Sequence, residues 1–215
     1  MGFDLHIPMD EHVLIVGQTG CGKTYLTEIY LANVPSMVIK LDVKLEALFN
    51  LKKNKTLWHG LNNEDVQIIQ SLEELPHVEK DRIIYCPNTN EMEFDYYNAL
   101  CEWVYNKGDC ILWIDELMSI CPNANQCLPW LKVLYTRGRF INAVVWSCTQ
   151  RPMEIPNICI ANSQHFFVFN TKMPQDRKKL VESTGCMEFY KIPPKYYFTY
   201  FRDGMDNGIT ATLTI

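Results

Sequence analysis

The residues best suited to chemistry in this sequence form a glycine-rich turn that directly follows an apolar run. Residues 13–24 are VLIVGQTGCGKT and match the G-x-x-x-x-G-K-[ST] phosphate-loop (Walker A) pattern at every position. A polyphosphate needs backbone N–H groups converging on it, and glycines let the main chain turn tightly and approach closely. The pattern therefore predicts that a triphosphate is bound by Gly17, Gln18, Thr19, Gly20, Cys21, Gly22, Lys23 and Thr24.

The last two residues of this turn add side-chain chemistry. We expect the ammonium group of Lys23 to reach the β and γ phosphates and the hydroxyl of Thr24 to bind Mg²⁺. An amphipathic helix predicted to begin here directs the positive end of its dipole at the anion. ATP and Mg²⁺ are thus the expected cofactors. Cys21 has two interpretations: a small residue at a permissive position, or a thiol whose modification blocks nucleotide entry.

A second apolar run ends in two acids. Residues 110–116 are CILWIDE, which is typical of a strand buried on both faces whose carboxyl end delivers Asp115 and Glu116 to a nucleotide crevice. After a full phosphate loop, this pattern is a Walker B motif, and we assign Asp115 to the Mg²⁺ shell. Glu116, one residue further, is placed to polarise a water, which predicts hydrolysis and not transfer to a bound alcohol.

A third candidate follows another apolar strand. AVVWSC at 143–148 is succeeded by Thr149, Gln150, Arg151 and Pro152. Gln150 at such a strand tip either senses the γ-phosphate and orients water, or is a solvent-exposed loop amide.

These residues must be positioned by an alternation of strands and helices. The alternation predicts an α/β fold with a mostly parallel central sheet flanked by helices and with antiparallel strands at the C-terminus. Residues 51–80 are interpreted as a loop or a short inserted element. The expected strands after the glycine-rich turn are 37–41, 82–86, 110–116, 143–148, 165–170, YYFTYF (196–201) and ITATLTI (209–215).

Length and composition bound the remaining possibilities. A chain of 215 residues with 47% hydrophobic and 21% charged residues is typical of one globular domain. We expect a core of about 12–185 and a C-terminal strand extension of about 186–215. No apolar run is long enough to span a bilayer, and the first residues lack the features of a signal peptide, so a cytoplasmic location is expected.

The nine cysteines show no C-x-x-C pair or metal-ligand spacing, which argues against a disulfide framework or a zinc site. A net charge of −5 excludes a broad basic surface, so contact with nucleic acid requires a local cluster. Lys52, Lys53 and Lys55 form one such cluster, although a solvated charge run is its commoner meaning.

Residues 137–163 resemble a stretch of the FtsK and HerA superfamily of DNA-pumping ATPases. In that family a strand ends in Thr-Gln-Arg-Pro, followed by a proline-containing turn and an Ile-Ala-Asn segment, as Thr149–Pro152 and Ile160–Asn162 do here. Asp42 and Lys44 likewise resemble the Asp-x-Lys that follows the second strand of the family. The likeness covers most of the chain, with several motifs in the same order.

The resemblance implies a ring of five or six subunits with ATP at each interface. An arginine before the Thr-Gln-Arg-Pro strand acts there on the neighbouring subunit's nucleotide as an arginine finger, which points to Arg139, with Arg137 a close second. Gln150 would report the γ-phosphate. Double-stranded DNA would pass through the central pore and be contacted along its backbone, independently of sequence.

Within the superfamily, a compact chain of this kind is most similar to the genome-packaging ATPases of membrane-containing double-jelly-roll viruses. This likeness implies capsid or membrane-vertex proteins as further partners, and a place in the host cytoplasm or at a packaging vertex of the virion. Three alternatives stay open: another motor of the superfamily, for plasmid transfer or end resection; a small P-loop phosphotransferase; and a non-catalytic nucleotide switch.

Overall fold

Apolar strands and amphipathic helices alternate along the chain in the computed structural model, which describes residues 5–213. The strands are β1 (Val13–Val16), β2 (Met37–Leu41), β3 (Val66–Ile69), β4 (Arg82–Tyr85), β5 (Cys110–Ile114), β6 (Ala143–Thr149), β7 (His165–Val168), β8 (Tyr197–Arg202) and β9 (Ile209–Thr212). The helices are α1 (Lys23–Ala32), α2 (Glu46–Lys52), α3 (Phe94–Lys107), α4 (Pro129–Arg137), α5 (Asn157–Ala161) and α6 (Pro174–Thr184).

The strands of the described residues form one sheet in the order β3-β4-β2-β5-β6-β1-β7-β8-β9. Neighbouring strands from β3 to β7 are parallel, whereas β8 is antiparallel to β7 and β9 is antiparallel to β8. The predicted fold class, a mostly parallel sheet with antiparallel C-terminal strands, is thereby confirmed. Because β6 lies between β1 and β5, the residues after β6 lie between the glycine-rich turn and the two acids.

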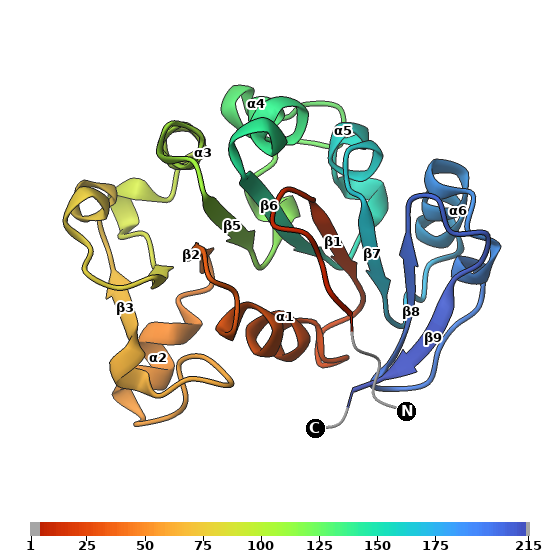
Figure 1. The fold of residues 1–215 in the computed structure, drawn as a ribbon, viewed down its shortest axis with the longest axis horizontal. Helices are drawn as coiled ribbons and strands as arrows, with labels where there is room; N and C mark the ends of the chain where they lie inside the picture. The colour runs from red at the N-terminus through yellow and green to blue at the C-terminus, as the bar shows by residue number, and fades with distance from the viewer. Residues whose placement is uncertain (1–4, 214–215) are drawn as a thin grey trace.

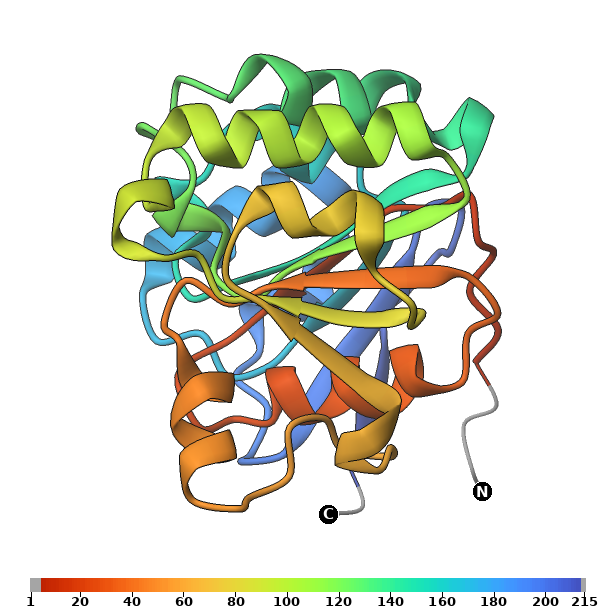
Figure 2. The ribbon, with the colours of Figure 1, turned by 90° about the vertical axis from the view of Figure 1, so that its left-hand side faces the viewer.

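Helices cover both faces of this sheet. Figure 1 shows α3, α4, α5 and α6 along the upper face and α1 and α2 along the lower face, and Figure 2 shows the same three layers from the side of β3. Successive strand residues point to opposite faces: Leu14 and Val16 pack in the core under α3 and α4, and Val13 and Ile15 in the core over α1. Burial on both faces explains why β1 is uninterruptedly apolar.

The segment 51–80 is more structured than its sequence predicts. It contains β3, which pairs with β4 at the edge of the sheet, and Trp58, which is fully buried. The indole Nε1 of Trp58 donates a hydrogen bond to the backbone oxygen of Glu28 on α1 at 2.8 Å. A strand of four residues gives too short a pattern to detect, and the burial of Trp58 depends on a contact with a distant helix.

Other predicted boundaries differ slightly. The strand predicted at 82–86 ends at Tyr85, and the C-terminal strand ends at Thr212, with the last two residues of ITATLTI outside the described range. Helix α3 ends at Lys107 and is followed by Gly108, whose φ of 63° lies in the left-handed region that glycine adopts without strain.

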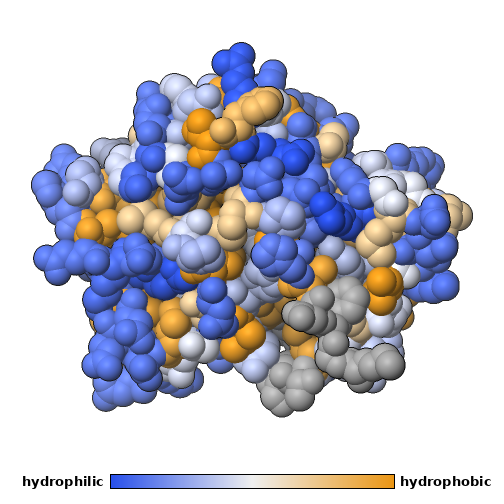
Figure 3. All heavy atoms as spheres, viewed as in Figure 1, coloured by the Kyte–Doolittle hydropathy of each residue, from blue (hydrophilic) through white to orange (hydrophobic). Residues whose placement is uncertain are grey.

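The distribution of hydrophilic and apolar residues on the surface agrees with the globular composition of the chain. On the face shown in Figure 3, hydrophilic residues predominate and surround smaller, separate apolar patches. No helix within residues 5–213 combines the length and apolar character that a bilayer crossing requires. All nine cysteines are free thiols; eight are buried, and Cys127 is partly buried.

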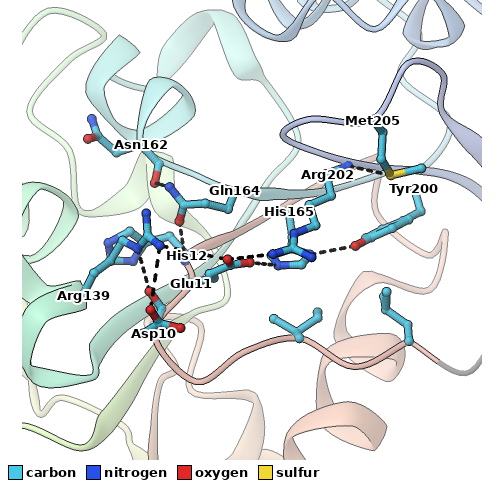
Figure 4. Close-up of polar contacts among 12 residues, drawn as sticks. Asp10, Glu11, His12, Arg139, Asn162, Gln164, His165, Tyr200, Arg202 and Met205 are labelled. Atoms are coloured by element: carbon cyan, nitrogen blue, oxygen red, sulfur yellow. Dashed lines mark hydrogen bonds and ion pairs between the residues drawn. The ribbon is translucent and has the colours of Figure 1, made fainter.

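A buried polar network lies at the amino ends of β1 and β7 (Figure 4). Glu11 accepts a hydrogen bond from Arg202 at 2.9 Å and contacts the ring of His165, whose Nδ1 lies 2.8 Å from the hydroxyl of Tyr200. His12, with no exposed surface, accepts a hydrogen bond at Nδ1 from the backbone N–H of Val145 on β6 at 2.9 Å.

This network makes stability sensitive to acid. Burial, with a smaller effect of the Arg139 charge, lowers the pKa of His12 to about 4, against about 6.5 in an unfolded chain. Between these values the unfolded state binds more protons, so the stabilisation is complete above about pH 6.5 and is lost as the pH falls toward 4. We expect His12 alone to lower the free energy of unfolding by on the order of 3 kcal/mol by pH 4.

Urea unfolding at pH 7 and at pH 4.5 measures this effect. His12→Asn, whose amide oxygen can replace Nδ1 as the acceptor for Val145, should reduce the loss, whereas His77→Gln on the surface should leave it unchanged. If the free energy of unfolding fell equally between pH 7 and pH 4.5 in wild type and in His12→Asn, the loss could not be assigned to His12.

Candidate active site

The glycine-rich turn connects the end of β1 to the first residue of α1. Gly20 and Gly22 have φ values of 76° and 110°, in the region that disfavours other residues. A Cβ atom on Gly22 would also lie 2.5 Å from the end of the Leu213 side chain, which would have to move to admit a larger residue. No side chain caps α1, which leaves its first backbone N–H groups available to an anion at the end where the helix dipole is positive.

Lys23 spans the turn from the first position of α1. Its ammonium group donates hydrogen bonds to the backbone oxygens of Gly17 at 2.7 Å and Gln18 at 3.1 Å. The side chain is mostly buried, so the charge is held against the backbone of the turn.

The two predicted magnesium ligands meet between α1 and β5. The hydroxyl of Thr24 donates a hydrogen bond to Asp115 Oδ1 at 3.1 Å. A hydroxyl and one carboxylate are the protein share of a typical Mg²⁺ site, where water and phosphate oxygens supply the other ligands. Within the described residues, no group of three or more His, Cys, Asp or Glu could hold a metal ion, so an ion here would depend on those further oxygens. The donor set fits Mg²⁺.

Glu116 and Gln150 are joined at the neighbouring strand tips. Gln150 Nε2 donates to Glu116 Oε2 at 2.8 Å, and Gln150 Oε1 accepts a hydrogen bond from the hydroxyl of Thr19 at 3.0 Å. Lys44 Nζ lies 3.4 Å from the same carboxylate oxygen of Glu116. The other oxygen, Oε1, is buried and has no hydrogen-bond partner among the described residues. Gln150 therefore links the glycine-rich turn to the carboxylate of Glu116, whose Oε1 has no hydrogen-bond donor among the described residues.

Asp42 lies behind this site. Its Oδ2 accepts a hydrogen bond from the backbone N–H of Ala47 at 2.8 Å, and the side chain is almost fully buried. Asp42 thus fixes the start of α2, whereas Lys44, two residues later, reaches the site itself.

A cleft of about 510 Å³ lies over the turn, within the size range of ligand pockets. Polar residues of the turn and strand tips form one end of it. Aromatic rings also line the cleft, and our sequence reasoning did not find them. They are Tyr25, His59 and Tyr196.

A buried ion pair that the motif search also missed holds α1 on the sheet. Lys40 Nζ on β2 lies 2.8 Å from Glu28 Oε1 on α1, and 4.3 Å from the centre of the Trp113 ring on β5. Burial opposes the charge on Lys40, but the carboxylates of Glu28, Asp115 and Asp42 outweigh it and raise its pKa. The sequence feature that could have indicated this ion pair is a lysine inside the apolar strand MVIKL.

Cys21 is a buried thiol within the turn. Burial raises its pKa, although the charge of Lys23 acts in the opposite direction. The thiol form is less nucleophilic than the thiolate, so the geometry favours the interpretation of Cys21 as a small residue at a permissive position.

Arg137 and Arg139 do not reach this site. They precede β6, whereas Gln150 follows it, and seven residues of strand span about 23 Å. Arg139 is bound within its own chain: Nε donates to the backbone oxygen of Asp10 at 2.8 Å, and Nη2 lies 3.8 Å from its carboxylate (Figure 4). Arg137 is exposed and makes no side-chain hydrogen bond or ion pair within residues 5–213.

No protein-family model and no curated protein sequence matches the chain, so the comparison depends on three-dimensional structure. The genome packaging NTPase B204 of Sulfolobus turreted icosahedral virus 2, in complex with ATP-gammaS, superposes with a TM-score of 0.73 at 17% identity, covering 97% of this chain and 100% of B204. VirB4 of Thermoanaerobacter pseudethanolicus gives 0.61 at 11% identity, covering 97% and 93%. The conjugation coupling protein TcpA of pCW3 gives 0.57 at 16% identity, covering 96% of this chain and 61% of TcpA.

The chain has the fold of these structures, that of P-loop NTPases. In this fold the turn after β1 is the P-loop. Strand β6 lies between β1 and β5, the strand that is followed by the two acids. The predicted resemblance is confirmed at the level of the fold, which also agrees over nearly the full length of B204.

The P-loop geometry predicts the effect of removing Lys23. Lys23→Ala should weaken binding of a non-hydrolysable ATP analogue by at least about tenfold, because a charge-assisted hydrogen bond to phosphate contributes about 1.5–3 kcal/mol. Isothermal titration calorimetry measures the affinity, and Lys53→Ala, at an exposed lysine, is the control. Equal affinity of Lys23→Ala and wild type would exclude this turn as the phosphate site.

Proposed function

We propose that this protein binds ATP at the P-loop and hydrolyses it to drive movement of double-stranded DNA. The observation that carries the proposal is the convergence of three strand ends on one cleft: the P-loop after β1, Asp115 and Glu116 after β5, and Gln150 after β6. B204, whose fold the chain shares, is a packaging NTPase with structures in complex with ATP-gammaS and AMPPCP. Both facts support nucleotide binding by this chain.

Each residue then has a role that follows from its contacts. Backbone N–H groups of the P-loop and the ammonium of Lys23 bind the phosphates, and Thr24 with Asp115 would hold Mg²⁺. Bound Mg²⁺ would neutralise the charge that develops on the phosphate oxygens. The unpaired Oε1 of Glu116 is an acceptor for a proton of the attacking water.

Gln150 couples the γ-phosphate to this base. It is hydrogen-bonded both to Thr19 of the P-loop and to Glu116, so a phosphate that displaces Thr19 or Gln150 also changes the position of the carboxylate. The amide is therefore suited to report whether the γ-phosphate is present.

A cation from a second subunit completes the site. One chain places Arg137 and Arg139 at the opposite end of β6 from its own cleft, so they can act only on the nucleotide of a neighbour. A trans arginine of this kind contributes about 10³–10⁵ in rate. We propose a ring of five or six subunits, nearly inactive as separate monomers.

Genome packaging is the favoured setting. This chain and B204 cover each other almost completely with a TM-score of 0.73, whereas the chain spans only 61% of TcpA and superposes on VirB4 with a lower TM-score of 0.61. A packaging ATPase would act in the host cytoplasm or at a vertex of the virion and contact capsid or membrane-vertex proteins. Similarity of the fold to TcpA and VirB4 supports a DNA-transfer motor as the second candidate.

The decisive experiment is an ATPase assay with and without double-stranded DNA, at protein concentrations that span assembly. Turnover should rise with concentration and with DNA. Mixing Arg137→Ala/Arg139→Ala with Glu116→Gln should restore part of the hydrolysis that each variant lacks, because an intact base and an intact arginine then meet at some interfaces. Hydrolysis independent of concentration and of DNA would reject the motor.

Glu116→Gln should retain ATP binding and lower turnover by about 10²–10⁴, the usual contribution of a general base. Glu182→Gln, at an exposed carboxylate on α6 that lines neither this cleft nor the space beside it, is the matched control and should keep binding and most of the turnover. Steady-state hydrolysis and calorimetric binding, measured on the same samples, separate the two effects. A Glu116→Gln enzyme that hydrolyses ATP at the wild-type rate would remove Glu116 from the mechanism.

A further inference from the structure

An aromatic side chain stands almost fully in solvent at the amino end of β6. Phe140 lies in the short 3₁₀ turn Gly138–Ile141 and is 90% exposed, the largest value among the exposed large hydrophobic residues. Arg137, which is exposed and makes no side-chain hydrogen bond or ion pair with any described residue, precedes this turn at the end of α4. Phenylalanine and arginine are enriched in protein interfaces, and a large exposed aromatic group is a typical anchor.

A second cleft of about 510 Å³ lies beside the P-loop. Met118 and Met173 contribute apolar surface to it, and Met173 is 46% exposed. Methionine adapts its shape to a partner and makes favourable contacts with aromatic rings. Gln18, Thr19 and Gln150 also line the cleft, and the last two line the nucleotide cleft as well, so the two spaces adjoin.

The charges of this second cleft are nearly balanced. Arg151 bonds Asp176 at 2.9 Å and Glu154 at 3.1 Å, and Lys172 adds a further cation. Asp176 is buried, but the Glu154 side chain is 41% exposed and offers a carboxylate to an incoming guanidinium.

The aromatic turn and the methionine cleft lie at opposite ends of the same strand. The turn precedes Ala143, and Gln150 of the cleft follows Thr149, so a chain cannot place its own Phe140 in its own cleft. A second copy can do so. A contact between two different patches of identical chains is head-to-tail, and it repeats into a ring where the rotation between neighbours closes.

We propose that Phe140 docks into the methionine cleft of a second copy of this chain, between Met118 and Met173, and brings Arg137 to the neighbour's nucleotide. This inference rests on the proposed ATPase function and names the contact that assembles its site. Arg137 is the trans-acting cation, because its guanidinium has no hydrogen-bond or ion-pair partner within residues 5–213. Arg139 instead anchors the turn to Asp10, which holds Phe140 outward.

The first test is cross-linking between two variants. Phe140→Cys is mixed with Met173→Cys and oxidised mildly with and without a non-hydrolysable ATP analogue. The mixture should give a covalent dimer that neither variant gives alone, and mixing Phe140→Cys with Leu51→Cys should give none. Leu51 is a suitable control because it is 49% exposed on α2, at the other end of the sheet. Absence of the dimer, or an equal yield with Leu51→Cys, would overturn the proposed docking.

The second test compares self-association and turnover. Phe140→Ser should weaken association, measured by sedimentation velocity, roughly 30-fold or more, as loss of an interface anchor does, whereas Leu51→Ser should not. Arg137→Ala should lower turnover, whereas its self-association and the binding of ATP to the monomer should stay as in wild type. Arg139→Ala, compared at an equal amount of assembled protein, should lower turnover less than Arg137→Ala does.

The outcomes separate this inference from the proposed function. If wild type hydrolyses ATP but Phe140→Ser assembles and turns over normally, the docking is wrong and the ATPase stands. If wild type binds and hydrolyses no ATP, the ATPase is wrong, and the cross-link still decides the docking. Capture of Phe140 by a different protein, without contact between copies, would also reject the inference.

Discussion

The structure depends on the convergence of three parallel strands, β5, β6 and β1, whose carboxyl ends meet at one edge of the sheet. In a sheet of parallel strands that is buried on both faces, the carboxyl ends of the strands lie along the same edge. Polar residues that directly follow these strands therefore become neighbours even when they are far apart in sequence. Thr24 and Asp115, 91 positions apart, are joined by a hydrogen bond of 3.1 Å. Everything the site can do follows from this arrangement.

Two buried polar arrangements hold those strands and the P-loop helix in register. The pair of Lys40 and Glu28 ties α1 to β2, and the contacts of Glu11, His12 and His165 tie the opposite ends of β1, β6 and β7 together. Buried charges are costly unless they are paired, so each set fixes one relative position of its elements. The nucleotide end and the arginine end of β6 are thereby parts of one rigid unit.

The two ends of β6 carry different surface features. The cleft lies at one end of β6 and the exposed turn with Arg137 and Phe140 at the other, about 23 Å away. In the proposed docking, a single chain carries both halves of a contact that it cannot make with itself. Such a contact joins copies head to tail.

The sequence by itself determined the P-loop, the acid pair, the alternation of strands and helices, and the fold class, because these depend on local patterns: glycine conformation, buried apolar runs and strand ends. It missed β3, Trp58 and the aromatic lining of the cleft. Only the tertiary structure decided that β6 separates β1 from β5, that Gln150 bridges Thr19 and Glu116, and that Arg139 is held by Asp10. Strand order and side-chain pairing come from long-range packing, and residues that meet across more than a hundred positions leave no periodic signal in the chain.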